Sequence, residues 1–134
     1  MTLPSAKSPT GVFIVDDHPS YRAVAEAVVQ STSGFAVIGS AGSAEGALGE
    51  IAAIAASPDL ILLDVNLGDA SGVDVAVALT VVRPNAKIVF VSVLQLDELP
   101  RGAHDSGASG YLSKLELSPV TLEQAWAGAY DWES

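Results

Sequence analysis

The chain has 134 residues and no cysteine, and its sixteen acidic residues outnumber six basic ones to give a formal net charge of −10. This length fits one domain with its own core, and the lack of cysteine excludes thiolate metal sites and cysteine nucleophiles. Because no basic stripe could neutralise phosphates and no apolar run could cross a bilayer, we expect a cytoplasmic protein that binds neither nucleic acid directly nor a membrane.

The first ten residues contain two prolines and two serines without periodicity. We therefore predict a flexible leader over residues 1–10 and one domain over residues 11–134. Short runs rich in Val, Ile and Leu then alternate with stretches of helical spacing. Runs that are apolar on both faces are typical of parallel strands covered on both sides. The predicted strands are residues 12–15, 35–38, 60–63, 87–92 and a weaker strand at 110–112.

Helical spacing fills the intervals between these strands. The predicted helices cover residues 19–31, 44–56 and 73–82, and a last helix begins at Ser118 as N-cap with Pro119 in its first position. Periodicity predicts the side chains that face the core. They are Tyr21, Val24 and Val28 in the first helix, and Leu122, Ala125, Trp126 and Ala129 in the last.

The interval before the fifth strand is less regular, because Pro100, Gly102 and Gly107 interrupt it. Proline is tolerated only in the first turn of a helix, so we expect a short or loosely held helix that begins near residues 97–98. Five strand–helix units predict an α/β fold of the flavodoxin-like (βα)5 kind, a doubly wound three-layer sandwich with a five-stranded parallel sheet.

Polar residues stand where the predicted strands end, and sites form at this edge of such sheets. Asp16 and Asp17 follow the first strand, Asp64 follows the third, Ser92 ends the fourth and Lys114 follows the fifth. Each alone has an ordinary explanation: a turn or helix cap, a polar loop, a strand-end hydroxyl and a solvated lysine. Their gathering at one edge is what favours a site.

The chemistry of these groups indicates what such a site would do. Crowded carboxylates need a compensating cation, and Mg²⁺ prefers oxygen ligands and keeps waters that a phosphate can displace. Aspartate also accepts phosphoryl groups covalently, and phosphoryl transfer requires mainly positioning and neutralised oxygens. We therefore expect Mg²⁺ at Asp17, Asp64 and a backbone carbonyl, with Lys114 and Ser92 on phosphoryl oxygens.

Several segments resemble the receiver domains of two-component response regulators, from Val12 to about Ala129. They are IVDDHP (residues 14–19), LLDVNLGDASG (62–72), VFVSV (89–93) and GASGYLSK (107–114). The resemblance implies a role for each site residue. Asp16 and Asp17 organise Mg²⁺, Asp64 accepts the phosphoryl group, the Asn66 carbonyl completes the metal shell, Ser92 follows the phosphoryl group, Tyr111 reports activation by its rotamer, and Lys114 is the site lysine.

The resemblance also implies partners. A sensor histidine kinase would phosphorylate Asp64, and the surface of the fourth helix, fifth strand and fifth helix would switch to control an output domain or partner. Such a protein phosphorylates and dephosphorylates itself without turning over an external substrate, and a homodimer is a further expectation. The motifs are most similar to the subfamily with a C-terminal helix-turn-helix domain. Since no output domain follows Ser134 in the sequence, we expect either a stand-alone receiver or a piece of a longer regulator.

Two departures and two alternatives accompany this interpretation. Gly68 and Leu115 stand where the family commonly has proline, which leaves the geometry of the 114–115 bond open. They favour a receiver-like docking or dimerisation module regulated without phosphorylation. The other alternative is a Mg²⁺-dependent aspartyl-phosphate hydrolase of the haloacid-dehalogenase type. Such an enzyme needs a second carboxylate where this chain has Asn66.

The remaining aromatic and histidine side chains are given ordinary roles. His18 is expected in a turn or helix cap, and His104 on the exposed side of the irregular helix. Tyr130 and Trp132 follow the last predicted helix, and a contact patch for a partner is one interpretation of them.

Overall fold

The computed structural model describes residues 8–133, and residues 1–7 of the predicted leader lie outside them. The described residues form one parallel sheet with the strand order β2-β1-β3-β4-β5. All five predicted strands are confirmed. They are β1 (Thr10–Val15), β2 (Phe35–Ala41), β3 (Leu60–Leu63), β4 (Lys87–Ser92) and β5 (Gly110–Ser113).

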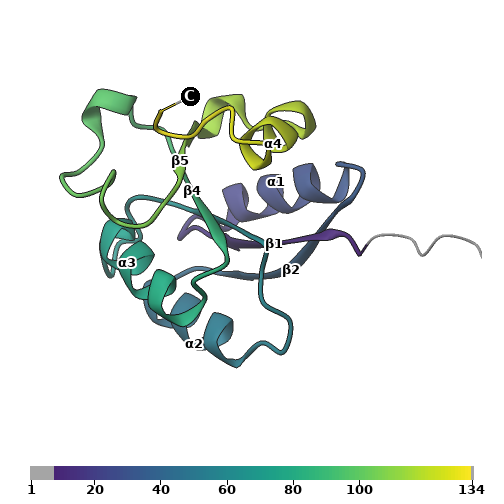
Figure 1. Ribbon diagram of the computed structural model, residues 1–134, viewed down its shortest axis with the longest axis horizontal. Coiled ribbons are helices and arrows are strands. Elements are labelled where there is room, and N and C mark those ends of the chain that lie inside the picture. The colour runs from purple at the N-terminus through teal and green to yellow at the C-terminus, as the bar shows by residue number, and fades with distance from the viewer. Residues whose placement is uncertain (1–7, 134) are drawn as a thin grey trace, which may run out of the picture.

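Helices cover both faces of this sheet. α1 (Pro19–Gln30) and α4 (Pro119–Trp126) lie on one face, and α2 (Ala44–Ala53) and α3 (Gly72–Val82) lie on the other (Figure 1). The predicted doubly wound three-layer sandwich is therefore confirmed. Because the chain moves from β1 outward to β2 and then back to β3, the order reverses between β1 and β3. The loops that follow these two strands diverge there and leave a crevice at the carboxyl edge.

The strands are buried on both sides because alternate residues enter two separate cores. Phe13, Leu63 and Phe90 pack with α2 and α3, whereas Ile14 and Leu62 pack with α1 and α4. This two-sided burial explains why the strands appear in the sequence as continuous apolar runs rather than as alternating patterns.

Short polar side chains fix where three of the helices begin. Ser43 caps α2, Ser71 caps α3 and Ser118 caps α4, and each side chain accepts a hydrogen bond from a backbone N–H of the first turn. α1 has no side-chain cap, but it begins with Pro19, whose missing N–H costs nothing at that position. As a result α1 starts only two residues after the end of the Asp16–Asp17 pair.

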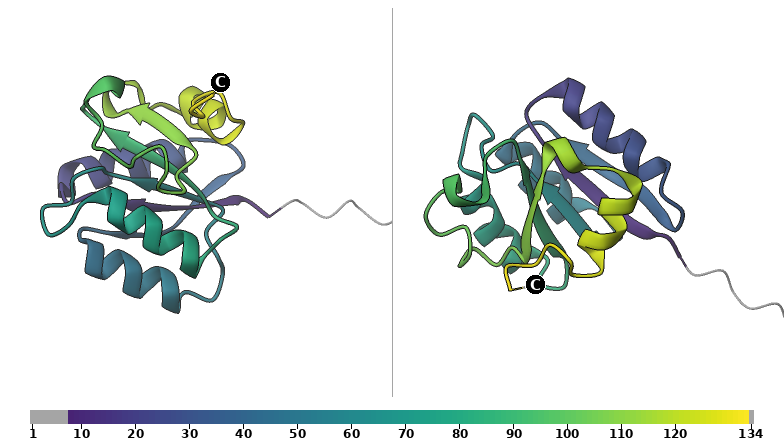
Figure 2. Two further views of the ribbon diagram at one scale, coloured as in Figure 1. Left: turned by 60° about the vertical axis from the view of Figure 1, so that its left-hand side comes forward. Right: turned by 90° about the horizontal axis from the view of Figure 1, so that it is seen from above.

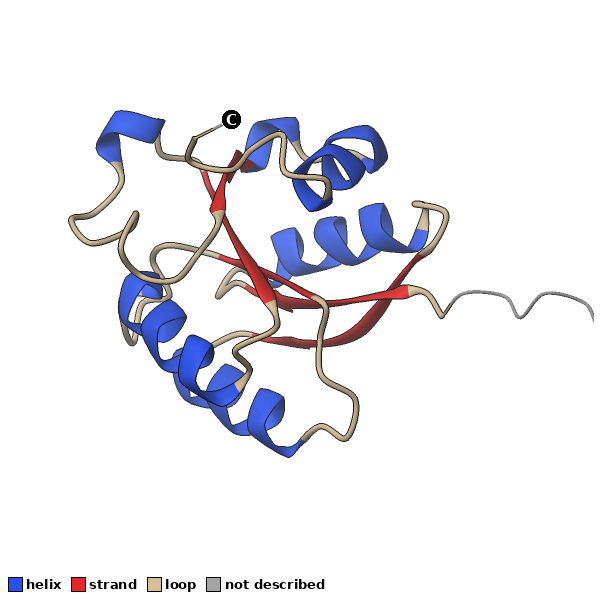
Figure 3. Cartoon of the chain, viewed as in Figure 1, coloured by secondary structure: helices blue, strands red, loops and turns tan. Residues whose placement is uncertain are grey.

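The short helix expected before β5 is present only as a 3₁₀ turn that ends before Pro100, so the expected start near residues 97–98, with Pro100 in the first turn, is wrong. Residues 93–109, all of which the structure describes, contain only the 3₁₀ turn η1 (Leu96–Glu98), followed by turns (Figure 3). η1 ends before Pro100 because Leu99, which precedes the proline, is extended. Gly102 and Gly107 both have positive φ, which ends any helical path between them.

Three expectations about core packing also require correction. Val24 is 51% exposed, because the buried side of α1 is formed by Ala25 and Val29. Trp126 is 38% exposed, and Ala129 is exposed as well. α4 ends at Trp126, so the helical periodicity used to place Ala129 does not extend that far.

After α4 the chain turns back along β5 as a short segment that we call the C-terminal strap (residues 127–133). Asp131 forms an antiparallel bridge with Gly110, and the Tyr111 amide donates to the Tyr130 carbonyl over 3.2 Å. The strap is the yellow segment that follows α4 and leads toward the C-terminus in both views of Figure 2. β5 therefore has β4 on one side and the strap on the other.

Trp132 anchors the strap. The centroid of its ring lies 4.1 Å from that of the His104 ring and 6.4 Å from that of the Phe90 ring. Its indole N–H donates to the Ala108 carbonyl over 2.8 Å. Trp132 is thus partly buried against the core and also lines an open cavity, and the contact patch expected for Tyr130 and Trp132 stays a prediction. His104 is exposed as expected, although it lies in a turn rather than on a helix.

Candidate functional site

The predicted strand-end residues meet at one open cavity of about 540 Å³. Asp17 comes from the end of β1, Asp64 from the end of β3, Ser92 from the end of β4 and Lys114 from the end of β5. Asn66 lies in the wall of the same cavity. Residues spread over most of the chain therefore surround one space, as the sequence predicts.

The acidic pair is held by the start of α1. The Arg22 side chain donates to the Asp16 carbonyl over 2.7 Å, and the Asp16 carboxylate accepts from the His18 amide over 2.9 Å. The imidazole of His18, which is the N-cap residue of α1, lies 3.0 Å from Asp17. These contacts bury Asp16 and leave Asp17 partly open to the cavity.

Asp64 lies at the bottom of the cavity and is only 5% exposed. One carboxylate oxygen accepts from the Asn66 amide over 3.3 Å. The backbone beside Asp64 is packed against Gly72, where a Cβ atom would overlap the Asp64 carbonyl oxygen. Only glycine allows this close approach, so the start of α3 fixes the position of Asp64.

Lys114 joins the carboxylates from the opposite side. Its ammonium lies 2.6 Å from an oxygen of Asp16 and 3.2 Å from an oxygen of Asp64. The lysine side chain is only 8% exposed. A solvated lysine is thus excluded, and the cation lies between the two buried carboxylates.

This geometry shifts the ionisation of the central groups. Burial raises the pKa of Asp64, and the nearby Asp16 charge raises it further, while Lys114 and the Asn66 amide partly oppose both. Burial works against the charge of Lys114, but the hydrogen bond to Asp16 and the Asp64 charge prevail and raise its pKa. The centre of the site therefore consists of two carboxylates that repel each other, Asp16 and Asp64, and one lysine cation that contacts both.

Ser92 and Tyr111 form a separate connection at the end of β4. Ser92 is buried, and its hydroxyl accepts from the Leu94 amide over 3.2 Å. The Tyr111 hydroxyl donates to the Ser92 carbonyl over 3.1 Å and also to the Leu94 carbonyl. Tyr111 is thereby bound directly to the strand end that carries Ser92.

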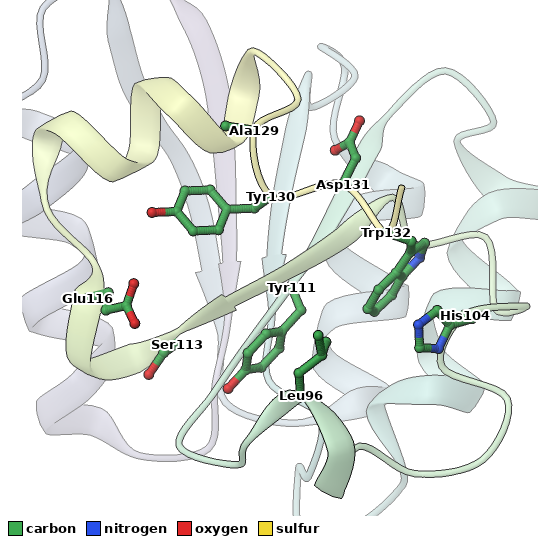
Figure 4. A pocket seen from close by; sticks show the side chains of 9 residues that line it. All are labelled: Leu96, His104, Tyr111, Ser113, Glu116, Ala129, Tyr130, Asp131 and Trp132. Carbon is green, nitrogen blue, oxygen red and sulfur yellow. The ribbon is translucent and has the colours of Figure 1, made fainter. Parts of the chain in front are cut away.

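Tyr111 also lines a second cavity of about 280 Å³. Figure 4 shows its ring beside Leu96, with His104 and Trp132 adjacent to each other farther along the wall. Ala129, Tyr130 and Asp131 of the strap complete this wall. Tyr111 therefore lies between the strand end at Ser92 and a surface formed by η1, β5 and the strap.

The donor set fits a hard divalent cation. Oxygens of Asp16, Asp17 and Asp64 and a nitrogen of His18 all lie within 4.8 Å of one another. Three carboxylates supply oxygen ligands of the kind that Mg²⁺ prefers. The acidic cluster is thus consistent with the metal site of receiver domains.

The two departures from the family pattern have simple structures. Gly68 has φ +78°, a conformation that proline cannot adopt, and it lies beside the Asp17 carboxylate. Leu115 is 87% exposed, and the 114–115 peptide bond is trans, as are all bonds in the described residues. Neither residue removes a group from the site.

One site residue was missed by the sequence prediction. Tyr21 was expected only to pack on the core, yet its ring lies under the Lys114 ammonium, 4.6 Å from ring centroid to nitrogen. Burial raises the pKa of its hydroxyl, and the charges of Asp16 and Asp64 add to the effect, so the phenol stays protonated. The position of Tyr21, one helical turn after the acidic pair, was the signal in the sequence that could have placed it at the site.

Comparison with known proteins agrees with this site. The family described as response regulator receiver domain matches residues 12–126. The nitrate/nitrite response regulator protein NarP of Escherichia coli is 35% identical over 127 residues, which cover 95% of this chain and 58% of that protein. Response regulator GacA of Pseudomonas aeruginosa is 31% identical over 120 residues, covering 87% of this chain and 55% of that protein. The chain thus spans about half the length of the curated relatives it matches.

Solved structures give the same result for the fold. A two-component response regulator of the LuxR family from Aurantimonas sp. matches with a TM-score of 0.78 and 26% identity, over 91% of this chain and 85% of that one. The signal receiver domain of the putative response regulator NarL from Mycobacterium tuberculosis has a TM-score of 0.78 and 24% identity, over 91% and 99% of the two chains. No helix within residues 8–133 is long and apolar enough to span a bilayer.

Proposed function

The chain belongs to the response regulator receiver family, and from this premise we propose that Asp64 accepts a phosphoryl group and that its charge switches the surface around Tyr111. A receiver domain is a signalling module rather than a classical enzyme, and receiver domains of two-component systems partner with histidine kinases. The pocket of Asp16, Asp17 and Asp64 is typical of a phosphoacceptor site.

The observation that carries the proposal is the ammonium of Lys114 between the carboxylates of Asp16 and Asp64, at 2.6 and 3.2 Å. In the proposed transfer, an Asp64 oxygen forms a bond to phosphorus while the bond from phosphorus to a kinase histidine, or to a small phosphodonor, breaks. Lys114 then moves its contact from the Asp64 oxygen to a phosphoryl oxygen. Such transfer depends mainly on this kind of positioning and charge compensation.

We further propose Mg²⁺ as the metal of this site, held by Asp16, Asp17, Asp64 and the backbone carbonyl of Asn66. When bound, the metal would neutralise phosphoryl oxygens as the charge on them develops. The hard oxygen donors of the cluster support this choice of ion.

The switch is proposed to travel through Ser92. A phosphoryl oxygen on Asp64 would draw the Ser92 hydroxyl inward and shift the end of β4. Because the Tyr111 hydroxyl donates to the Ser92 carbonyl over 3.1 Å, the ring would have to change its position with the strand. The surface formed by η1, β5 and the C-terminal strap would change with it. This surface is proposed to control an output domain, a partner or a homodimer.

The test is to incubate the protein with acetyl phosphate and Mg²⁺ and to measure its intact mass. We expect one phosphoryl adduct on the wild type and none on Asp64→Asn. Asp74→Asn, a change at an exposed aspartate in the first turn of α3, is the matched control and should keep the adduct. An adduct that persists in Asp64→Asn would refute the assignment.

The two alternatives are less well supported by the site. A hydrolase would need a proton-donating carboxyl group at residue 66, whereas the Asn66 side chain is an amide that accepts a hydrogen bond from Gly68. A docking module that is regulated without phosphorylation would not require the buried contact of Lys114 with Asp64. Equal partner affinity with and without a beryllofluoride phosphoryl mimic would favour the docking module.

A further inference from the structure

Tyr21 contacts Lys114 in two independent ways. The lysine ammonium lies over the Tyr21 ring at 4.6 Å from its centroid, and the Tyr21 hydroxyl donates to the Lys114 backbone carbonyl over 3.3 Å. Tyr21 is in the first turn of α1, whereas Lys114 follows β5 at the other side of the cavity. A single side chain therefore connects α1 with both the backbone and the charged end of Lys114.

The other contacts of the ammonium are with Asp16 and Asp64. These are the carboxylates that a metal ion and a phosphoryl group would occupy, so both ion pairs weaken at the moment when the lysine is needed. An ammonium on a flexible four-carbon stem would then be free to leave for solvent. The attraction between the ammonium and the face of an aromatic ring does not depend on either carboxylate.

We propose that Tyr21 is a positioning residue that keeps the Lys114 ammonium beside Asp64 while the neighbouring carboxylates are engaged. The ring holds the charged end, and the hydroxyl holds the backbone from which the side chain extends. Tyr21 acts through Lys114 and takes no part in bond formation. This inference rests on the proposed function, because it assigns Lys114 to the phosphoryl group.

Two substitutions separate the ring from the hydroxyl, and a third controls for lost packing. Tyr21→Phe keeps the ring and removes the hydrogen bond, whereas Tyr21→Leu removes both. Phe35→Leu is the matched control, because Phe35 packs partly buried against the same core as Tyr21 but lies at the start of β2, away from the cavity. For each protein, the rate of adduct formation from acetyl phosphate is measured as a function of Mg²⁺ concentration.

We expect Tyr21→Leu to lower the rate at saturating Mg²⁺ about fivefold, in line with a partly desolvated cation–ring contact. The Mg²⁺ concentration for half-maximal rate should not rise, because Lys114 is not a metal ligand. Tyr21→Phe should retain most of the rate, and Phe35→Leu should match the wild type. The proposal is overturned if Tyr21→Leu reacts at the wild-type rate, or if Phe35→Leu loses as much as Tyr21→Leu.

A second measurement needs no phosphoryl transfer. The ε-methylene protons of Lys114 lie near the face of the ring, so their NMR signals should be shifted upfield in the wild type and in Tyr21→Phe. The shift should disappear in Tyr21→Leu, and an unchanged signal there would contradict the positioning role. If the wild type forms no adduct, the proposed function fails, whereas the NMR result still decides whether Tyr21 holds Lys114.

Discussion

Asp64 is held in a position that opposes its own ionisation. Burial and the Asp16 charge raise its pKa, and they outweigh the compensation from Lys114. Between its unfolded and folded pKa values the folded state binds more protons than the unfolded state, so the stability falls as pH rises through this window. The carboxylate that carries the proposed chemistry is therefore a source of instability at neutral pH.

Replacing this carboxylate should stabilise the metal-free protein. We expect Asp64→Asn to raise the free energy of unfolding at pH 7 by about 1 kcal/mol, because a neutral amide is not opposed by burial and by the Asp16 charge as the carboxylate is. The gain should shrink as the pH falls through the folded pKa of Asp64 and should vanish below its unfolded pKa. Urea denaturation in the presence of a chelator, at neutral and acidic pH, checks this. A variant less stable than the wild type at neutral pH would contradict it.

Lys114 is the cation that compensates the buried carboxylates of Asp16 and Asp64. Lys114→Gln leaves Asp16 and Asp64 close together without their cation, and we expect a loss of about 3 kcal/mol in chelator, because removing one partner leaves buried charge uncompensated. Mg²⁺ should restore much of the loss. Lys87→Gln is the control: its ion pair with Asp131, at 2.9 Å, lies outside the site. The control should cost less and should not respond to Mg²⁺, as measured by thermal unfolding.

At the level of single residues, the sequence predicted the strand-end groups better than the aromatic ones. A carboxylate that directly follows an apolar run can only lie at the edge of the sheet, so Asp64 and Lys114 were located by topology alone. Tyr21 and Trp132 were not, because an aromatic side chain in a helix or tail satisfies the same pattern in many places. Which ring contacts which neighbour depends on packing between segments far apart in sequence.

Among the elements, the strap depends on a backbone contact that only glycine permits. A Cβ atom at Gly110 would overlap the Tyr130 carbonyl oxygen, so Gly110→Ala should displace the strap and cost about 2 kcal/mol, as overpacking does. Gly49→Ala is the control, because nothing lies within 4 Å of its added carbon on the exposed side of α2. It should stabilise the protein by about 1 kcal/mol through helix propensity.

Denaturation curves and Trp132 fluorescence in a Trp126→Phe background would measure both glycine variants. Displacement of the strap should change the emission of Trp132, since its ring would leave His104 and Phe90. Unchanged emission in Gly110→Ala would show that the strap tolerates the added methyl group.

The strands were predicted more accurately than the helices. Two-sided burial makes each strand a continuous apolar run, and two of the five, Leu60–Leu63 and Lys87–Ser92, have the predicted bounds. The interval after β4 holds a short helix as expected, but the helix ends earlier than predicted, because Pro100 and two glycines with positive φ end the helical path after Glu98. A periodicity argument also carried the last helix too far, to Ala129, although the chain leaves the helix to pair with β5.

For the molecule as a whole, a divalent cation should act on stability through the acidic cluster. We expect Mg²⁺ to raise the melting temperature in proportion to the logarithm of its concentration, because it binds only the folded arrangement. Asp17→Asn should weaken the effect strongly, whereas Asp74→Asn should leave it intact. Thermal unfolding at constant ionic strength separates specific binding from general screening of the net charge of −10. Equal responses of the two variants would count against a specific site.

The fold as a whole followed from the order of the apolar runs, and the site followed from the fold. Alternating strands and helices predict a parallel sheet, and a parallel sheet places every strand end at one edge. What the sequence did not reveal is how the surface around β5 is built. That surface depends on a proline, a few glycines and a tail, whose joint conformation has no periodic pattern.

The strap beside β5 has a consequence for encounters between molecules. An outer strand normally offers a row of free backbone groups to which another chain can add, and proteins protect such edges to avoid aggregation. Here the Tyr111 amide and the Ser109 carbonyl are already bonded to Tyr130 and Trp132 of the same chain. A partner that approached from this side would therefore have to contact side chains, because the backbone groups are not free for strand addition. Loosening the strap would expose an edge prone to self-association.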